Sequence, residues 1–300
     1  MLNYRLEGSG EPLLLIHGWG VTYATWDNLA PLLTPHFQLI MIELPGIGGS
    51  PQIEAEEPYY PTCAEEIEAV RLMLGIEKWS LLAYSSGTRA AEAYVQRYPQ
   101  SVQNAIFLCP IYLVEIWTLF LHVLENTQNL TIRRWLLSHW RLYSLILALG
   151  FNGRPHTYTS TWKHEIELQS QDILIRTLCE IPGKGRRPFE LPEVSTLFIW
   201  GERDALTARP RPLRPNDILI PANHSAPMLA ANYVAEIVIP FIQDGKLVAI
   251  HRRRARRPQR PNRDREMSYA IKRVRSRIRR ASRRRFVLRR KAVRNEHQLL

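Results

Sequence analysis

The stretch WSLLAYSSGTRAAEAYVQRYP, residues 79–99, begins as an apolar strand and continues directly as a helix. Its second half is rich in alanine and long side chains that favour a helix, which has to end before Pro99. The pentapeptide AYSSG, residues 83–87, lies at the junction. A strand that bends sharply into a helix at a serine is the local structure that presents a nucleophile at the edge of a sheet.

Two adjacent serines compete for the apex of this bend. The residues two before and two after the apex have to be small, because the strained turn crowds them. For Ser85 these residues are Ala83 and Gly87, whereas Ser86 would have Tyr84 on one side. We therefore predict that Ser85 is the nucleophile.

A serine hydroxyl is a weak nucleophile that needs a general base, and the base needs an orienting acid. Asp204 comes just after one predicted strand, in TLFIWGERDALT, and His224 comes just after the next, in DILIPANHSAPM. The order Ser85, Asp204, His224 is one of the orders in which a catalytic triad occurs. Glu202 is an alternative acid, although the turn after the strand favours Asp204. The other eight histidines are less suitable by position: His17, His36, His122, His139, His156, His164, His251 and His297.

A second loop is predicted to complete the site. The segment LLLIHGWG, residues 13–20, ends a predicted strand, and glycines on both sides of Trp19 allow its amide to face the serine. We expect the backbone N–H groups of Trp19 and Ser86 to form an oxyanion hole, because the helix dipole that begins at Ser86 favours negative charge. Trp19 and Tyr84 are the candidate substrate-binding side chains. The alternative is that HGWG is only a tight turn.

Short apolar runs alternate with helical patterns along the chain. Near-continuous apolarity suits the strands of a parallel sheet that is covered on both faces. The predicted strands are 12–18, 37–46, 79–85, 104–110, 195–201 and 217–221. The predicted helices are 24–34, 62–75, 86–98 and 228–243. This alternation predicts an α/β protein with a doubly wound, mostly parallel sheet.

The alternation stops over residues 111–190, which are helical in pattern and rich in tryptophan. We interpret this segment as a helical lid inserted in a core made of residues 1–110 and 191–245. Segments near the carboxyl ends of strands are where such folds place substrate pockets, and the apolar lid suggests an apolar acyl pocket. The alternative is a second packing layer without a pocket. Arg134 and Arg141 share a helical face in the lid and could attract an acidic carrier protein or an acid-bearing substrate, or could simply be solvated.

The net charge of +12 is distributed unevenly. Residues 251–300 carry 21 Lys and Arg against 3 Asp and Glu, so the rest of the chain is net acidic. We expect residues 246–300 to form an Arg-rich linker and an amphipathic basic helix, which could contact nucleic acid or an anionic membrane surface. The alternatives are a solubilising tail or a C-terminus translated beyond the natural domain.

Three widely spaced cysteines, Cys63, Cys109 and Cys179, fit neither a disulfide framework nor a metal site and favour a reducing compartment. The start of the chain has no evident secretory signal, and no apolar run reaches the roughly 20 residues that span a bilayer. The sequence therefore predicts a cytoplasmic location. Neither a cofactor nor a metal is expected.

Five segments share their pattern with one superfamily: LLLIHGWG, IELPGIGGS, LLAYSSGTRAAEAY, LFIWGERDALT and NHSAPMLAANYVAEIVIPFI. On these segments the chain resembles the α/β hydrolases over residues 3 to about 243. Within that superfamily, HGWG, the Trp26 pattern and the lid resemble the pimeloyl-carrier-protein methyl ester esterases and other lid-bearing carboxylesterases. The resemblance implies an α/β-hydrolase fold and an esterase that forms an acyl-enzyme on Ser85, with His224 relaying the proton and Asp204 holding its tautomer. The ester could be carrier-linked.

Other members of the superfamily remain as alternatives. A serine nucleophile argues against its dehalogenases and epoxide hydrolases, which use an aspartate there. Lactonases, C–C hydrolases and cofactor-free perhydrolases share the triad and stay open. An alternative hypothesis is that the protein is not an enzyme but a binding protein with a hydrolase fold. Its triad would then be inactive, and its basic tail would contact the partner.

Three departures from the family pattern bear on the site. Glu43 stands where the family has the aspartate of a D-x-P-G turn, and we expect it to shape the turn equally well. Ala83 replaces a glycine but keeps the size rule. The proline-rich link from Asp204 to His224 cannot hold a normal crossover helix, so His224 is expected to be less firmly placed.

Overall fold

The computed structural model describes residues 1–54, 57–112, 165–166, 168–181 and 194–247. Seven strands form one sheet in the order β1-β3-β2-β4-β5-β6-β7. Every neighbouring pair is parallel except β1 and β3, which are antiparallel. The strands are β1 Tyr4–Glu7, β2 Glu11–Ile16, β3 Phe37–Ile42, β4 Trp79–Tyr84, β5 Val102–Leu108, β6 Ser195–Gly201 and β7 Asp217–Ile220.

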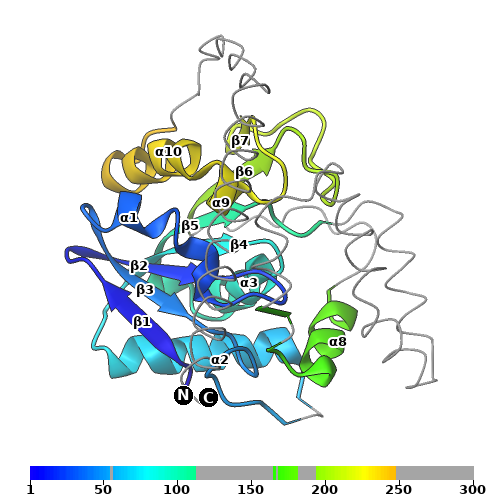
Figure 1. The fold of residues 1–300 in the computed structure, drawn as a ribbon. Helices are drawn as coiled ribbons and strands as arrows, with labels where there is room; N and C mark the ends of the chain where they lie inside the picture. Colours follow the sequence, from blue (N-terminus) through cyan, green and yellow to red (C-terminus); the bar gives the residue numbers. More distant parts are fainter. Residues whose placement is uncertain (55–56, 113–164, 167, 182–193, 248–300) are drawn as a thin grey trace, which may run out of the picture. The chain divides into compact units, whose positions relative to one another are not determined.

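Helices cover both faces of this sheet (Figure 1). They are η1 Tyr23–Trp26, α1 Ala30–Leu33, α2 Tyr59–Met73, α3 Gly87–Arg97, η2 Pro99–Ser101, α8 Gln171–Cys179, α9 Ala226–Leu229 and α10 Ala231–Asp244. Residues of α2 and α3 join one apolar cluster, and residues of α1 and α10 join the other. In β2, Leu14 and Ile16 contribute to the first cluster while Leu13 and Leu15 contribute to the second, since side chains alternate along a strand.

The predicted α/β fold with a doubly wound, mostly parallel sheet is confirmed, and all six predicted strands are present. Two helix predictions are wrong in detail. The helix expected over 24–34 is a short 3₁₀ helix followed by α1, which begins anew around Pro31. The helix expected over 228–243 is divided at Ala230, whose backbone is not helical. The edge strand β1 was not predicted, because YRLE carries two charges and no apolar run.

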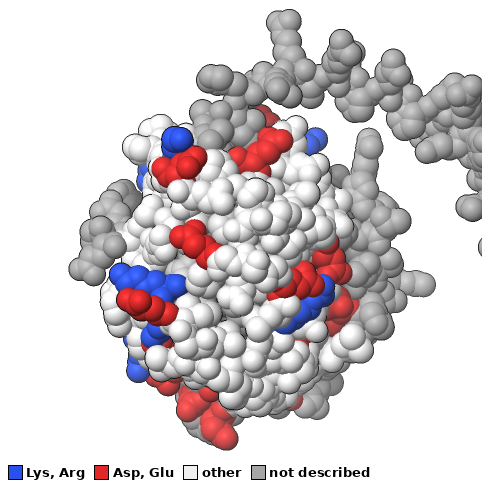
Figure 2. Space-filling view, turned by 90° about the vertical axis from the view of Figure 1, so that its left-hand side faces the viewer, with Lys and Arg blue, Asp and Glu red and all other residues white. Residues whose placement is uncertain are grey.

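Much of the predicted lid and nearly all of the predicted tail lie outside the described residues. The domain boundaries, the basic helix and the positions of Arg134 and Arg141 therefore stay predictions. Helix α8 falls inside the lid range and is helical, as expected there. Among the described residues, no helix is long and apolar enough to cross a membrane. On the face shown in Figure 2, some acidic groups of the described part lie beside basic ones and others lie among uncharged residues, without a large patch of one sign.

A buried histidine fixes the loop that follows β2. His17 is 1% exposed, its Nδ1 lies 2.7 Å from the carbonyl oxygen of Gly18, and its Nε2 accepts a hydrogen bond of 2.9 Å from the N–H of Leu44. These partners define the neutral tautomer that carries its proton on Nδ1. Burial lowers the pKa of His17 to about 4, although the bond to Gly18 acts in the opposite direction. The imidazole therefore connects the ends of β2 and β3 only while it is uncharged.

We expect acid to destabilise the fold through His17. The unfolded chain takes up this proton below its ordinary pKa of 6.5, whereas the folded chain resists protonation down to about 4. Stability from this group is therefore complete above the unfolded pKa and falls as the pH drops through that interval, by about 3 kcal/mol in all. Urea unfolding at neutral pH and at about pH 4.5 should show a larger loss for the wild type than for His17→Gln, which cannot titrate. Parallel losses in the two proteins would contradict this role.

Candidate active site

Ser85 occupies a sharp bend between β4 and α3. Its backbone φ is +54°, in the left-handed region that side chains other than glycine rarely adopt. Neighbouring main chain holds it there: the Ser85 N–H donates to the carbonyl of Leu108 at 3.0 Å, and its own carbonyl accepts from the N–H of Thr88 at 3.0 Å. The strained conformation that the sequence predicts at this residue is therefore observed.

The small flanking residues have a direct steric reason. A Cβ added to Gly87 would lie 2.2 Å from the carbonyl oxygen of His17 and 2.9 Å from that of Ile16, which is closer than real atoms approach. Ala83 is completely buried and lies between Ile16 of β2 and Phe107 of β5 in the sheet. The end of β2 thus presses against the first turn of α3, and this packing needs a glycine there.

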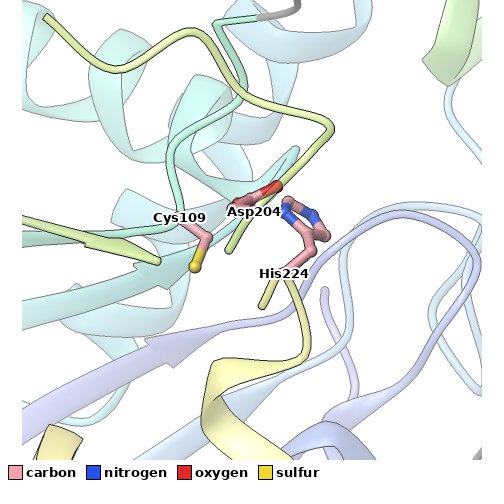
Figure 3. Close-up of side chains that lie close together, drawn as sticks. All are labelled: Cys109, Asp204 and His224. Atoms are coloured by element: carbon pink, nitrogen blue, oxygen red, sulfur yellow. Dashed lines mark hydrogen bonds and ion pairs between the residues drawn. The ribbon is translucent and has the colours of Figure 1, made fainter. Parts of the chain in front are cut away.

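The three side chains predicted as a triad lie in one hydrogen-bonded row. The Oγ atom of Ser85 is 2.7 Å from Nε2 of His224, and Nδ1 of His224 is 2.8 Å from Oδ2 of Asp204. The side chains of His224 and Asp204 are only 4% and 1% exposed. Each residue follows the carboxyl end of a parallel strand, β4, β6 or β7, which is why positions far apart in sequence meet at one edge. Figure 3 shows the Asp204 carboxylate turned toward the imidazole.

The environment of Asp204 keeps it ionised. Burial by itself would raise the pKa of Asp204, but the charge and hydrogen bond of His224, the N–H of Leu206 and the hydroxyl of Thr207 together bring it below the ordinary value. The Leu206 N–H donates to Oδ1 at 2.9 Å, on the oxygen that does not face the imidazole. Glu202, the alternative acid, is exposed at the surface. An ionised Asp204 fixes the Nδ1–H tautomer of His224, so that Nε2 can accept the serine proton.

Tyr84 supports the loop that carries His224. Its side chain is 4% exposed, and its hydroxyl donates a 2.9 Å hydrogen bond to the main-chain carbonyl of His224. The two rings are 5.4 Å apart and tilted by 39°. The sequence assigns Tyr84 to substrate binding, and that assignment stays a prediction. The contact with His224 was not foreseen, since nothing in a phenol at position 84 indicates a partner 140 residues away.

The loop after β2 lies directly beside Ser85. A Cβ on Gly18 would come within 3.1 Å of the Ser85 Cβ and 3.0 Å of the Tyr84 ring. The half-buried Trp19 donates its indole N–H to the carbonyl of Leu174 in α8 at 3.0 Å. The segment around α8 therefore holds the loop that is expected to supply one oxyanion donor. The roles of the Trp19 and Ser86 amides stay predictions.

Glu43 shapes the turn after β3, as expected. Its buried carboxylate accepts hydrogen bonds from the side chain of Asn3 and from the N–H of Gly49, both at 2.7 Å. A Cβ on Gly48, whose φ is +56°, would lie 2.2 Å from this carboxylate. The longer side chain is thus accommodated where the family pattern has aspartate.

Cys109 is a second feature that sequence reasoning did not connect with the site. It follows β5, is completely buried and has a φ of +46°. Burial raises the pKa of the Cys109 thiol above its ordinary value, and the nearby Asp204 carboxylate adds to this effect. Its position at the end of a predicted strand was a usable signal, because Ser85, Asp204 and His224 follow strand ends in the same way.

The seven-stranded, mostly parallel sheet with helices on both faces is the fold of the α/β hydrolases. Residues 11–142 match the family described as the alpha/beta hydrolase fold. Similar solved structures include a variant of an epoxide hydrolase from Bacillus megaterium, with a TM-score of 0.64, 18% identity, and coverage of 80% of this chain and 96% of that one. The enol-lactonase from Burkholderia xenovorans LB400 has a TM-score of 0.63, 17% identity and the same coverage. At these identities the likeness concerns the fold alone.

Among curated proteins the chain is similar to pimeloyl-[acyl-carrier protein] methyl ester esterases. It is 34% identical over 99 residues to that of Aeromonas salmonicida, covering 33% of this chain and 37% of the relative. It is 43% identical over 107 residues to that of Legionella pneumophila strain Corby, covering 35% and 41%. The chain thus spans about two fifths of the length of these relatives. The resemblance to α/β hydrolases and to this subgroup, which the sequence motifs indicate, is confirmed.

We expect the Tyr84 hydroxyl to position His224. Tyr84→Phe should lower the rate constant for labelling of Ser85 by a fluorophosphonate about fivefold to tenfold, which corresponds to about 1 kcal/mol for one buried hydrogen bond. Tyr94→Phe is the matched control, since it removes a hydroxyl that donates to Glu68 on the other face of the sheet. The free energy of unfolding of Tyr94→Phe should be lower than that of the wild type, but the fluorophosphonate should label its Ser85 at the wild-type rate. Equal labelling rates for Tyr84→Phe and the wild type would refute the positioning role.

Proposed function

We propose that the protein is a serine hydrolase that cleaves carboxylic esters through an acyl-enzyme on Ser85. The observation that carries the proposal is the buried row from Ser85 through His224 to Asp204, with contacts of 2.7 and 2.8 Å. Nucleophile, base and orienting acid each have the partner that their role requires. The ionised Asp204 and the left-handed Ser85 support the same assignment.

The reaction follows from these positions. As the Ser85 oxygen attacks the ester carbonyl, its proton moves to Nε2 of His224, and Asp204 stabilises the imidazolium that forms. The carbonyl oxygen becomes an oxyanion, which the backbone N–H groups of Trp19 and Ser86 would stabilise. His224 then gives its proton to the leaving alcohol, and the acyl group remains on Ser85. A water molecule, deprotonated by His224, attacks the acyl-enzyme. As the bond between the acyl group and Ser85 breaks, His224 returns the proton to the Ser85 oxygen and the acid is released.

The substrate class is proposed from the relatives. Their names describe a methyl ester joined to an acyl-carrier protein. We propose that the substrate is an ester with an apolar acyl part, either free or attached to a carrier protein. We further propose that such a carrier would bind next to the lid. The contacts between α8 and the loop of Trp19 support this placement, because they bring the lid segment to the site. Lactone, C–C and peracid chemistry use the same three residues and are distinguished by substrate tests.

Replacing the nucleophile should separate an active hydrolase from a lapsed scaffold. We expect Ser85→Ala to lower ester hydrolysis at least about 10³-fold, given how much a triad member contributes. The assay is a panel of p-nitrophenyl esters from acetate to octanoate, together with labelling by a fluorophosphonate. Ser86→Ala is the matched control, because it keeps the backbone N–H and should still be labelled. A wild type that neither turns over the panel nor reacts with the probe would support the binding-protein alternative.

A carrier-linked substrate should depend on the lid arginines. Reversing Arg134 and Arg141 to glutamate should lower kcat/KM for an acyl-carrier-protein ester about tenfold, because charges at an interface rim mainly steer association. Turnover of a small neutral ester by the same variant serves as the internal control and should stay intact. Equal effects on both substrates would show that the two arginines act on the fold and not on a carrier.

A further inference from the structure

The proposed hydrolysis does not use the thiol of Cys109, although this thiol lies beside the acid and the base. Cys109 follows β5, and its N–H donates to the carbonyl of Ile199 at 2.8 Å. Its backbone is left-handed, and among the described residues other than glycine only Ser85 shares this feature. Such strain is retained where the surrounding structure fixes a residue, and it is concentrated at functional sites.

Cys109, Asp204 and His224 together offer a thiol sulfur, a carboxylate oxygen and an imidazole nitrogen. These three atoms all lie within 4.8 Å of one another. They come from the ends of three adjacent parallel strands, so the sheet itself holds them together (Figure 3). All three side chains are buried, with Cys109 at 0% exposure.

We propose that this cluster is an inhibitory binding site for Zn²⁺. A site with one sulfur, one nitrogen and one oxygen donor suits Zn²⁺ better than harder cations such as Mg²⁺ or Ca²⁺, which bind through oxygen. Zinc binds Cys sulfur at about 2.3 Å, His nitrogen at about 2.0–2.1 Å and carboxylate oxygen at about 2.0–2.2 Å in a tetrahedral arrangement. Donor atoms bound in this way are about 3.3–3.7 Å apart, so side-chain shifts of about 1 Å would complete the site. A water molecule would fill the fourth position.

Zinc at this position would remove the general base. The Cys109 thiol would lose its proton to solvent and bind as a thiolate. When Nδ1 of His224 binds the metal, the ring proton that it carried moves to Nε2. Nε2 would then present an N–H to the Ser85 oxygen and could no longer accept its proton. The Asp204 carboxylate would also bind the metal and would no longer accept a hydrogen bond from the imidazole, so hydrolysis would stop until the metal dissociates.

Metal binding can be measured without any substrate, so its failure is distinguishable from failure of the proposed function. The probe is Co²⁺, which replaces Zn²⁺ and gives a thiolate-to-cobalt charge-transfer absorption when a cysteine binds it. We expect this band in the full-length wild type and in Cys63→Ser, whose thiol lies elsewhere in the core. We expect Cys109→Ser to lack it. Zn²⁺ should displace Co²⁺ from the wild type. The affinity of Cys109→Ser for Zn²⁺ should be at least about 100-fold lower than that of the wild type, a larger loss than the removal of an outer-sphere partner causes.

Two further variants keep the test decisive if Cys109→Ser folds poorly. Cys109→Ala should also lack the band, and His224→Gln, which retains the thiol, should bind Co²⁺ at least about tenfold more weakly. Zn²⁺ should inhibit hydrolysis by the wild type and by Cys63→Ser at concentrations that leave hydrolysis by Cys109→Ser unaffected. The rate of each protein is normalised to its own rate without metal. A wild type without the band, or a band and inhibition that persist without Cys109, would overturn the proposal.

Discussion

The left-handed backbone of Ser85 is the constraint on which the remainder of the site depends. A non-glycine residue in this conformation is strained by about 1–3 kcal/mol, so its neighbours have to impose it. Here β5 accepts its N–H at Leu108, and the end of β2 presses on Gly87. Ser85 is therefore positioned by the two strands on either side of β4. Its position at the carboxyl edge of the sheet is thus set by the packing of neighbouring strands as well as by the local sequence.

The loops around Ser85 hold one another in place. His17 joins the ends of β2 and β3, and the indole of Trp19 connects the next residues to α8. Tyr84 connects β4, the strand before Ser85, to the His224 loop. Each contact is a hydrogen bond made with buried or half-buried groups, where little water competes. These hydrogen bonds therefore hold the main chain around Ser85 and His224 in a fixed arrangement.

The sequence was sufficient for the features that depend on local pattern. Apolar runs predicted six strands, and the size rule around Ser85 selected one of two serines because sterics at a bend are local. Residues after strand ends predicted Asp204 and His224, since parallel strands bring their carboxyl ends to one edge. The strand β1 has no such pattern and pairs antiparallel with β3 at the edge of the sheet. Contacts such as Tyr84 with His224, or Cys109 with Asp204, depend on strand register and remained hidden.

The proline-rich link between β6 and β7 shows why a crossover helix is not needed to place His224. Residues 202–216 contain no helix, as predicted, yet β6 and β7 pair in parallel up to Gly201 and Ile220. Beyond the sheet, the N–H of Arg203 donates to the carbonyl of Ala222 at 2.9 Å, and its guanidinium donates to that of Pro221 at 2.6 Å. The Tyr84 hydroxyl then holds His224 itself. Register and these bonds hold the loop from both sides, while the looser histidine expected from the sequence stays a prediction.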